Sequence, residues 1–297
     1  MTSPLRLGLK LLGYLPLPLL HALGALAGWL LWLLPNKPRR LTRWHLQHCL
    51  PELDAATQRR IERQSLGHMM KAAIEAPALW FGPEQRLRRW IDSDPQTAQR
   101  FRDISSTGRG AIWLCPHWGA WELSGLFSSV QGTLTSLYKP QKGEMDALMH
   151  EGRTRLGATL VPTTGAGVKA LLGALKRGEM VGILPDHDPP PGSGRFAPLF
   201  GMPAHTTELV SKLAARSGAP VHFFIAERLR FGRGFRFHIL PAPADIADPE
   251  RGVTALNEGV EAIARRWPEQ YWWAYERYRR QPDGRPNPYK LKKSSRN

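Results

Sequence analysis

From residue 111 onward, short apolar runs alternate with segments of helical periodicity, and this alternation constrains the fold more than any other feature. Runs of strand length, bounded by Gly, Pro or polar turns, occupy Ala111–Cys115, Leu134–Tyr138, Ala158–Val161, Met180–Leu184, Val221–Arg228 and Phe235–Leu240. Helices are predicted over 144–156, 168–176, 206–217 and 253–267, and a loop over 192–201. Strands that alternate with helices predict an α/β fold with a central mixed sheet flanked by helices. The last two strands are expected to form a hairpin across residues 231–234.

The segment that precedes this alternation is predicted to be helical. Leu41, Trp44, His45 and His48 recur at helical spacing, and a longer helix is expected from Ala55 to Ala76, ended by Pro77. Two shorter helices are predicted over 84–91 and 95–104.

A mostly apolar block near the N-terminus predicts membrane attachment. No charged residue lies between Leu15 and Leu34, which is close to the length that spans a hydrocarbon core. Four basic residues follow within ten positions (Lys37, Arg39, Arg40 and Arg43), which favours a cytoplasmic C-terminal side and contact with anionic headgroups. Pro16, Pro18 and His21 leave two forms open, a transmembrane helix and a helix that lies in the interface. Residues 1–40 are therefore interpreted as an anchor with a basic flank, 41–280 as the main domain, and 281–297 as a basic, flexible tail.

Charge and cysteine content narrow the class of protein. The net charge of +16 implies an acidic partner, such as an anionic membrane, an acidic protein or nucleic acid. No signature of a nucleic-acid-binding module is present, and the apolar N-terminal block argues against that class. The two cysteines, Cys49 and Cys115, lie far apart and indicate a reducing compartment with no disulfide framework.

The stretch from Gly110 to Glu122 carries the clearest chemical signal. A predicted strand ends at a Pro-His pair, Gly119 follows, and a helix is expected to begin next. On one continuous helix His117 and Glu122 would lie about 140° apart, so they can meet only if His117 occupies the turn. A His in that position can act as a general base on an alcohol, and a carboxylate beside it can fix its tautomer. The alternative is a coincidental His and Glu, since such spacing is common.

Asp186 also follows a predicted strand, so it is expected to face the same cleft as His117, because ligands bind at the carboxyl ends of strands in open α/β sheets. The alternative role for Asp186 is a turn residue or helix cap before three prolines. The neighbouring His187 suggests a metal ligand, but no second His or Cys has ligand spacing, so no metal is predicted. The tryptophans Trp113, Trp118 and Trp121 are expected in the core or in the wall of a cleft.

These motifs resemble those of the late acyltransferases of lipid A biosynthesis, the lauroyl and myristoyl transferases within the glycerolipid acyltransferase-like group with a His-x4-Asp/Glu motif. The resemblance covers roughly residues 5–285. It rests on His-Trp-Gly-Ala-Trp-Glu at 117–122, Tyr-Lys-Pro at 138–140, Arg-Thr-Arg-Leu-Gly at 153–157, Asp186 after its strand, Phe-Gly-Met-Pro-Ala-His-Thr at 200–206, and the C-terminal Pro-Glu-Gln-Tyr-Trp-Trp and Glu-Arg-Tyr at 268–273 and 276–278. Ala120, Lys139 and His187 stand where the family commonly has Asn, Arg and Gln.

The resemblance implies a membrane-bound O-acyltransferase at the bacterial inner membrane, with its catalytic domain facing the cytoplasm and with no cofactor. It implies acyl transfer from acyl carrier protein or acyl-CoA to a hydroxyl of a lipid A precursor or related glycolipid. His117 would be the base and Glu122 would orient it. Arg155 or Arg153 would stabilise the oxyanion or bind a phosphate, Asp186 would hold an Arg or the acceptor hydroxyl, and Lys139 would meet an acidic headgroup. Two alternatives remain: an acyltransferase with another membrane lipid as acceptor, and a non-catalytic membrane lipid-binding protein.

Overall fold

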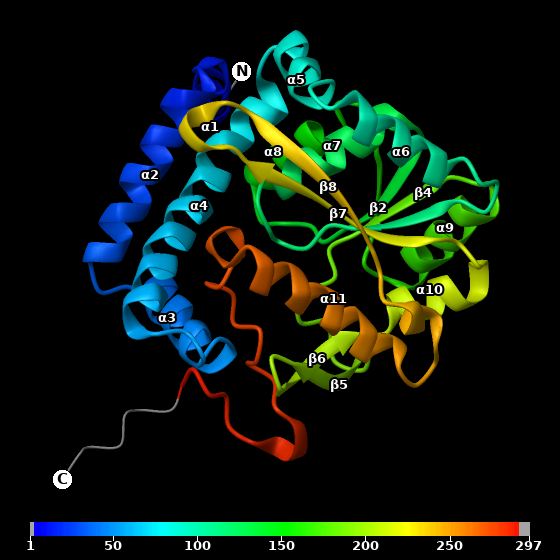
Figure 1. Ribbon diagram of the computed structural model, residues 1–297. Coiled ribbons are helices and arrows are strands. Elements are labelled where there is room, and N and C mark those ends of the chain that lie inside the picture. Colours follow the sequence, from blue (N-terminus) through cyan, green and yellow to red (C-terminus); the bar gives the residue numbers. More distant parts are fainter. Residues whose placement is uncertain (1–2, 291–297) are drawn as a thin grey trace.

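A six-stranded sheet forms the centre of the molecule in the computed structural model, which describes residues 3–290 (Figure 1). The strand order is β3-β2-β4-β1-β7-β8, and all neighbours are parallel except β7 and β8, which are antiparallel. The strands are β1 (Ala111–Leu114), β2 (Leu134–Tyr138), β3 (Thr159–Pro162), β4 (Met180–Ile183), β7 (Val221–Arg228) and β8 (Phe235–Pro241). The predicted mixed sheet and the β7–β8 hairpin are confirmed.

Helices cover both faces of the sheet, which is why the central strands are apolar throughout and do not alternate. Every residue of β1 and β4 is buried. Ala111 and Trp113 pack into the core shared with Phe101 and Phe127, whereas Ile112 and Leu114 pack into the opposite core with α9, α10 and α11. The covering helices are α5 (Glu84–Ile91), α6 (Pro95–Ser105), α7 (Trp121–Gln131), α8 (Glu144–Thr154), α9 (Gly165–Lys176), α10 (Leu209–Ser217) and α11 (Gly252–Arg266).

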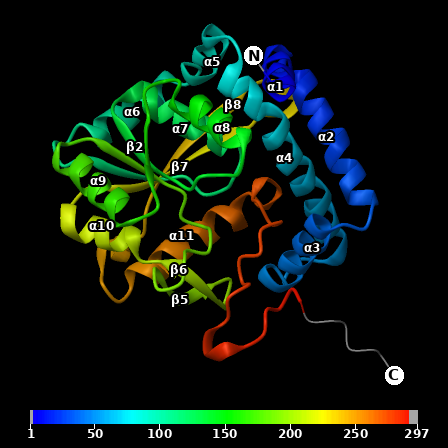
Figure 2. The ribbon, with the colours of Figure 1, turned by 180° about the vertical axis from the view of Figure 1, so that it is seen from behind.

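Four helices at the N-terminus stand together beside the sheet, at the left in Figure 1 and at the right in Figure 2. They are α1 (Pro4–Tyr14), α2 (Leu17–Leu33), α3 (Lys37–Cys49) and α4 (Ala55–Phe81). The prediction that Pro77 ends the long helix is wrong, because α4 continues through it to Phe81. The N-terminus of α4 is fixed by Asp54, whose carboxylate accepts the backbone N–H groups of Ala56 and Thr57.

Of the two forms left open for the N-terminal segment, a single transmembrane helix is not supported. Among residues 3–290, no helix is by itself long and apolar enough to cross a membrane. Helices α1 and α2 reach that length and composition only as a pair, and they are bent by 116° at the break before Leu17. Pro16 explains the break, because a proline has no backbone N–H to donate and disfavours a helical residue before it.

The loop expected over 192–201 is instead the first part of a β-hairpin. Strand β5 (Gly194–Leu199) pairs antiparallel with β6 (Met202–Thr207), and the helix predicted from 206 begins only at Leu209. The connecting residues Phe200 and Gly201 both have positive φ, +51° and +72°, as a tight two-residue hairpin turn requires. Pro198 and Pro203 face each other in this hairpin, and their presence concealed the strands in the sequence.

Candidate active site

The register between β1 and β4 brings the candidate residues together. Leu114 and Ile183 are partners at the carboxyl ends of these parallel strands. His117 and Asp186 each follow their strand end by three residues, so the two turns leave the same edge of the sheet side by side. The sequence prediction that both face one cleft is confirmed by a direct contact: Nδ1 of His117 lies 2.8 Å from Oδ1 of Asp186.

The turn that carries His117 is held by its backbone. The His117 N–H donates to Oδ2 of Asp186 at 2.8 Å, and the His117 carbonyl accepts the N–H of Trp272 at 3.0 Å. Gly119 has φ +56°, and a side chain there would lie 2.2 Å from the Ala226 carbonyl oxygen, so only glycine fits this turn. These backbone contacts therefore fix the position of His117.

Electrostatics in this pair favour a charged carboxylate next to the imidazole. Burial alone would raise the pKa of Asp186, but the charge and the hydrogen bonds of His117 outweigh burial and lower that pKa to about 2. The contact at Nδ1 places the Nε2 atom of His117 on the far side of the ring. Within residues 3–290 Nε2 has no hydrogen-bond partner, and it is not sealed from solvent. A neutral imidazole held in this way can accept a proton at Nε2.

His187 lies directly on the ring of His117. The two rings stack with centroids 3.7 Å apart and planes 7° from parallel, and Tyr275 stacks on the other face of His187 at 4.0 Å. Burial of its faces and the neighbouring His117 lower the pKa of His187 to about 3. Sequence reasoning considered His187 only as a metal ligand and missed this contact. The available signal was its position directly after Asp186 at a strand end.

Glu122 does not take the position expected of it. It lies in the first turn of α7, as predicted, but its carboxylate accepts the Nε–H of Arg153 at 2.9 Å and the indole N–H of Trp80 at 3.2 Å. A terminal N–H group of the Arg153 guanidinium donates to the other carboxylate oxygen of Glu122. No hydrogen bond connects Glu122 with His117, although the structure describes both. The carboxylate that orients His117 is Asp186, because the β1–β4 register delivers Asp186 to Nδ1, whereas α7 directs Glu122 toward α8.

The other predicted residues fall into two groups. Arg155 is bound away from His117, because its guanidinium donates to the carbonyls of Leu79 at 2.8 Å and Gly82 at 3.0 Å, at the C-terminal end of α4. Arg153 is partly exposed and lies over the ring of Tyr138, and Lys139 follows Tyr138 at the end of β2 with its side chain exposed. Arg153 and Lys139 are thus neighbours at the sheet edge that carries His117.

Of the three predicted tryptophans, two are buried in the core and one lies beside His117. Trp113 and Trp118 are fully buried core residues. Trp121 remains half-buried beside His117, with ring centroids 5.4 Å apart, and Trp272 lies 5.6 Å from His117 and 4.7 Å from Trp121. An aromatic wall therefore stands next to the proposed base.

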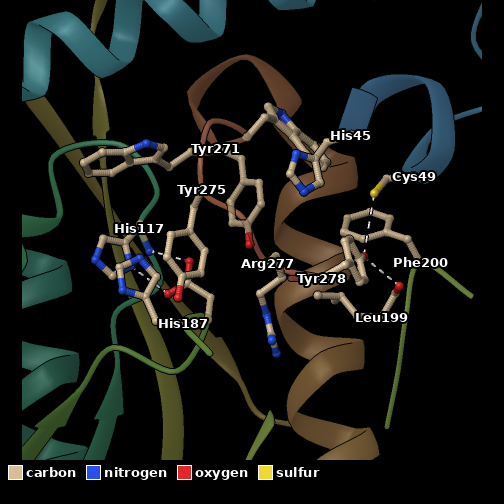
Figure 3. A pocket seen from close by; sticks show the side chains of 13 residues that line it. His45, Cys49, His117, His187, Leu199, Phe200, Tyr271, Tyr275, Arg277 and Tyr278 are labelled. Atoms are coloured by element: carbon tan, nitrogen blue, oxygen red, sulfur yellow. Dashed lines mark hydrogen bonds and ion pairs between the residues drawn. The ribbon is translucent and has the colours of Figure 1, made fainter. Parts of the chain in front are cut away.

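A small cavity is lined in part by His117 and Asp186 (Figure 3). Its volume of about 10 Å³ suits a single water molecule. The C-terminal segment lines much of it through Tyr271, Arg277 and Tyr278, together with His45 and Cys49 of α3. The buried Arg277 donates to the carbonyl of His205 and to the hydroxyl of Thr206, which anchors this segment to β6. A cavity of this size cannot hold a substrate molecule.

A His–Asp pair at the carboxyl ends of two parallel strands is a common arrangement in the active sites of α/β enzymes. The sequence profile of the bacterial lipid A biosynthesis acyltransferases matches residues 5–280, and the chain belongs to that family. The protein is therefore an acyltransferase, as the resemblance implied, and the alternative of a non-catalytic lipid-binding protein is set aside.

Three relatives from Escherichia coli (strain K12) show how evenly the similarity extends. The lipid A biosynthesis lauroyltransferase is 29% identical over 279 residues, which cover 93% of this chain and 90% of the relative. The palmitoleoyltransferase is 26% identical over 278 residues, with the same coverage of both chains. The myristoyltransferase is 25% identical over 286 residues, covering 93% of this chain and 84% of the relative.

Proposed function

We propose that this protein transfers a fatty acyl chain from an acyl thioester, carried by acyl carrier protein or coenzyme A, to a hydroxyl of a lipid A precursor or related glycolipid. The observation that carries the proposal is the His117–Asp186 pair, which leaves Nε2 of His117 as a free proton acceptor at the sheet edge. The family membership and the names of the relatives support a lipid A-type acceptor.

In the proposed reaction, Nε2 of His117 takes the proton of the acceptor hydroxyl as its oxygen attacks the thioester carbonyl carbon. Asp186 keeps the proton of neutral His117 on Nδ1 and stabilises the imidazolium that forms. Collapse of the tetrahedral intermediate breaks the carbon–sulfur bond, and the imidazolium returns its proton to the leaving thiolate. The products are the ester and a free thiol. Trp121 and Trp272 would form an apolar wall for the start of the acyl chain.

Arg153 and Lys139 are proposed to bind an anionic group of the substrate, such as a phosphate. Glu122 engages Nε and one terminal nitrogen of Arg153, so the guanidinium keeps a further donor group and a fixed orientation. In this arrangement Glu122 positions Arg153 and does not act on His117.

The N-terminal helices are proposed to lie in the membrane interface at the cytoplasmic side of the bacterial inner membrane. One face of α2 packs on α4 through Leu20, Gly24 and Gly28, while its opposite face exposes large apolar side chains: Leu19, Leu23, Leu26, Trp29, Leu30 and Leu33. The basic cluster at the start of α3 follows at once. An apolar helix face with cations at its edge is typical of interfacial attachment to anionic lipid.

The decisive experiment is acyl transfer by purified protein from radiolabelled acyl-carrier-protein and acyl-CoA donors to a lipid A precursor, resolved by thin-layer chromatography. We expect label in the glycolipid for the wild type and for His48→Ala, an exposed histidine on α3, and none above background for His117→Ala. Full activity of His117→Ala would overturn the site. Label in another membrane lipid but not in the lipid A precursor would overturn the acceptor.

A further inference from the structure

The proposed reaction, on which this inference rests, passes through a tetrahedral oxyanion that needs a hydrogen-bond donor near His117. The arginines considered from the sequence do not supply it. Arg155 donates to two backbone carbonyls at the C-terminal end of α4, and the remaining donor of Arg153 is assigned above to an anionic group of the substrate. The donor has to come from the immediate neighbourhood of the His117 ring.

His187 has the geometry of such a donor. Its ring lies parallel to that of His117 with centroids 3.7 Å apart, so a substrate atom bound at the Nε2 edge of His117 is also close to the rim of the His187 ring. Both faces are covered, by His117 and by Tyr275, and the Tyr275 hydroxyl is itself fixed by the backbone N–H of Asp188 at 3.1 Å. Nevertheless, the residue is exposed, and neither ring nitrogen has a hydrogen-bond partner within residues 3–290. The faces of the ring are thus covered by two other rings, while part of the residue remains exposed to solvent.

The charge state of His187 suits this task. The covering of its faces and the neighbouring His117 lower the pKa of His187, so the ring is neutral at physiological pH and carries one N–H donor. A charged ring at this distance would repel the imidazolium that forms on His117 during the reaction. A neutral imidazole can polarise a carbonyl without that penalty.

We propose that His187 is a second catalytic residue, whose ring N–H donates to the thioester carbonyl oxygen and to the oxyanion that replaces it. As the acceptor oxygen bonds to the carbonyl carbon, the carbonyl π electrons move to oxygen and the N–H bond of His187 stays intact. The oxyanion then re-forms the carbonyl and expels the thiolate. His187 stabilises charge and exchanges no proton, while His117 carries the proton.

Two substitutions separate this role from ring stacking. His187→Phe keeps a flat ring between His117 and Tyr275 but removes the N–H, whereas His187→Gln removes the stack but keeps an N–H donor. Loss of one oxyanion donor costs about 10²–10³-fold in kcat. We therefore expect such a loss in His187→Phe with the KM for both substrates little changed, while His187→Gln keeps most of the wild-type kcat. Thermal unfolding checks that both variants fold, and His48→Phe is the matched control.

A second readout distinguishes an oxyanion donor from an acceptor-binding residue. Slow hydrolysis of the acyl donor, measured without acceptor, passes through the same kind of oxyanion, so His187→Phe should lower hydrolysis and transfer alike. An unchanged kcat in His187→Phe, or a rise confined to the KM for the acceptor, overturns the proposal. If His187→Phe is active and His187→Gln is inactive, the contribution of His187 to kcat comes from ring stacking and the proposal is overturned. A wild type that acylates no lipid A precursor overturns the proposed function, and the hydrolysis assay still tests His187.

Discussion

Asp186 forms two hydrogen bonds with His117: Oδ1 lies 2.8 Å from the ring Nδ1, and Oδ2 accepts the backbone N–H at 2.8 Å. Asp186→Asn preserves the shape but replaces one oxygen with an NH₂ group, which stabilises the wrong tautomer of His117. Loss of a comparable carboxylate in other His-based sites lowers kcat by about 10⁴-fold, and we expect a loss of about 10²–10⁴-fold here, with KM little changed. Steady-state acyl transfer measures this, with the exposed Asp103→Asn as control. A variant that keeps more than about a tenth of kcat would contradict the assignment.

Glu122 is expected to behave differently from Asp186, because its partner is Arg153. Glu122→Gln leaves a largely buried guanidinium without its counter-charge, and we expect a loss of about 2 kcal/mol in the free energy of unfolding. Because Arg153→Met removes the charge that Glu122 neutralises, the double variant should cost about 1 kcal/mol less than the sum of the singles. Urea denaturation measures the cycle. Glu84→Gln, in the exposed pair with Arg88, is the control and should cost little. Strict additivity would refute the coupling.

The part of the site that depends on local pattern could be predicted from the sequence. Apolar runs located β1 and β4, and Gly119 located the turn, so His117 and Asp186 were expected at one edge of the sheet. Their contact follows from the pairing of Leu114 with Ile183, because each of the two residues lies three positions beyond its strand end.

The contacts that the sequence did not show depend on how helices pack, which no local pattern encodes. Glu122 meets Arg153 because α7 and α8 approach each other, and Arg155 meets Leu79 and Gly82 because α8 approaches α4. The stacking of His187 on His117 is likewise a contact between two turns. Sequence spacing placed Glu122 in the correct turn of the correct helix but could not show which neighbour its side chain would reach.

Protonation of His45 should weaken the attachment of the C-terminal segment. In the neutral ring, Nδ1 donates to the Leu41 carbonyl at 2.9 Å and Nε2 accepts the hydroxyl of Tyr289 at 2.7 Å, while that hydroxyl accepts the Tyr278 N–H at 3.0 Å. Burial lowers the pKa of His45 from 6.5 to about 4. Between these values the unfolded chain binds a proton that the folded chain does not, so stability falls as pH falls.

The expected loss between pH 6.5 and pH 4 is about 3 kcal/mol for this group. The measurement compares the free energy of unfolding of the wild type with that of His45→Gln at several pH values in this range. The contributions of all other titrating groups are the same in both proteins, so they cancel in the difference. The difference should move in favour of the variant as pH falls. A difference that stays constant with pH would show that His45 titrates alike in both states.

The contact between α2 and α4 depends on two glycines, Gly24 and Gly28, and Gly28 makes the closer approach. A Cβ at Gly28 would lie 2.4 Å from the Gly67 Cα and 2.7 Å from the Leu66 carbonyl oxygen, both backbone atoms that cannot turn aside. Gly28→Ala should force the helices apart and cost about 1–3 kcal/mol. A Cβ at Gly67 would meet nothing within 4 Å, so Gly67→Ala is the matched control and should be neutral or stabilising. Thermal unfolding that ranks the two variants in the reverse order would exclude this packing.

Phe231 extends the proposed membrane face beyond α2. It stands at the tip of the β7–β8 hairpin with 86% of its surface exposed and a positive φ of +58°, between the exposed Arg230 and Arg233. The adjacent Gly232 touches Pro18 of α2, so the tip lies at the edge of the apolar face. An exposed phenyl ring in a costly backbone conformation, flanked by two cations, suits insertion at an anionic bilayer surface.

Burial of a phenyl side chain contributes about 1.5–3 kcal/mol, so Phe231→Ser should weaken binding to phosphatidylglycerol-containing vesicles by about 10- to 100-fold. Phe196→Ser, on β5, is the control. Equal vesicle binding of both variants in a sedimentation assay would show that Phe231 is not part of the membrane face. The contribution of α2 is tested separately with Leu26→Asp.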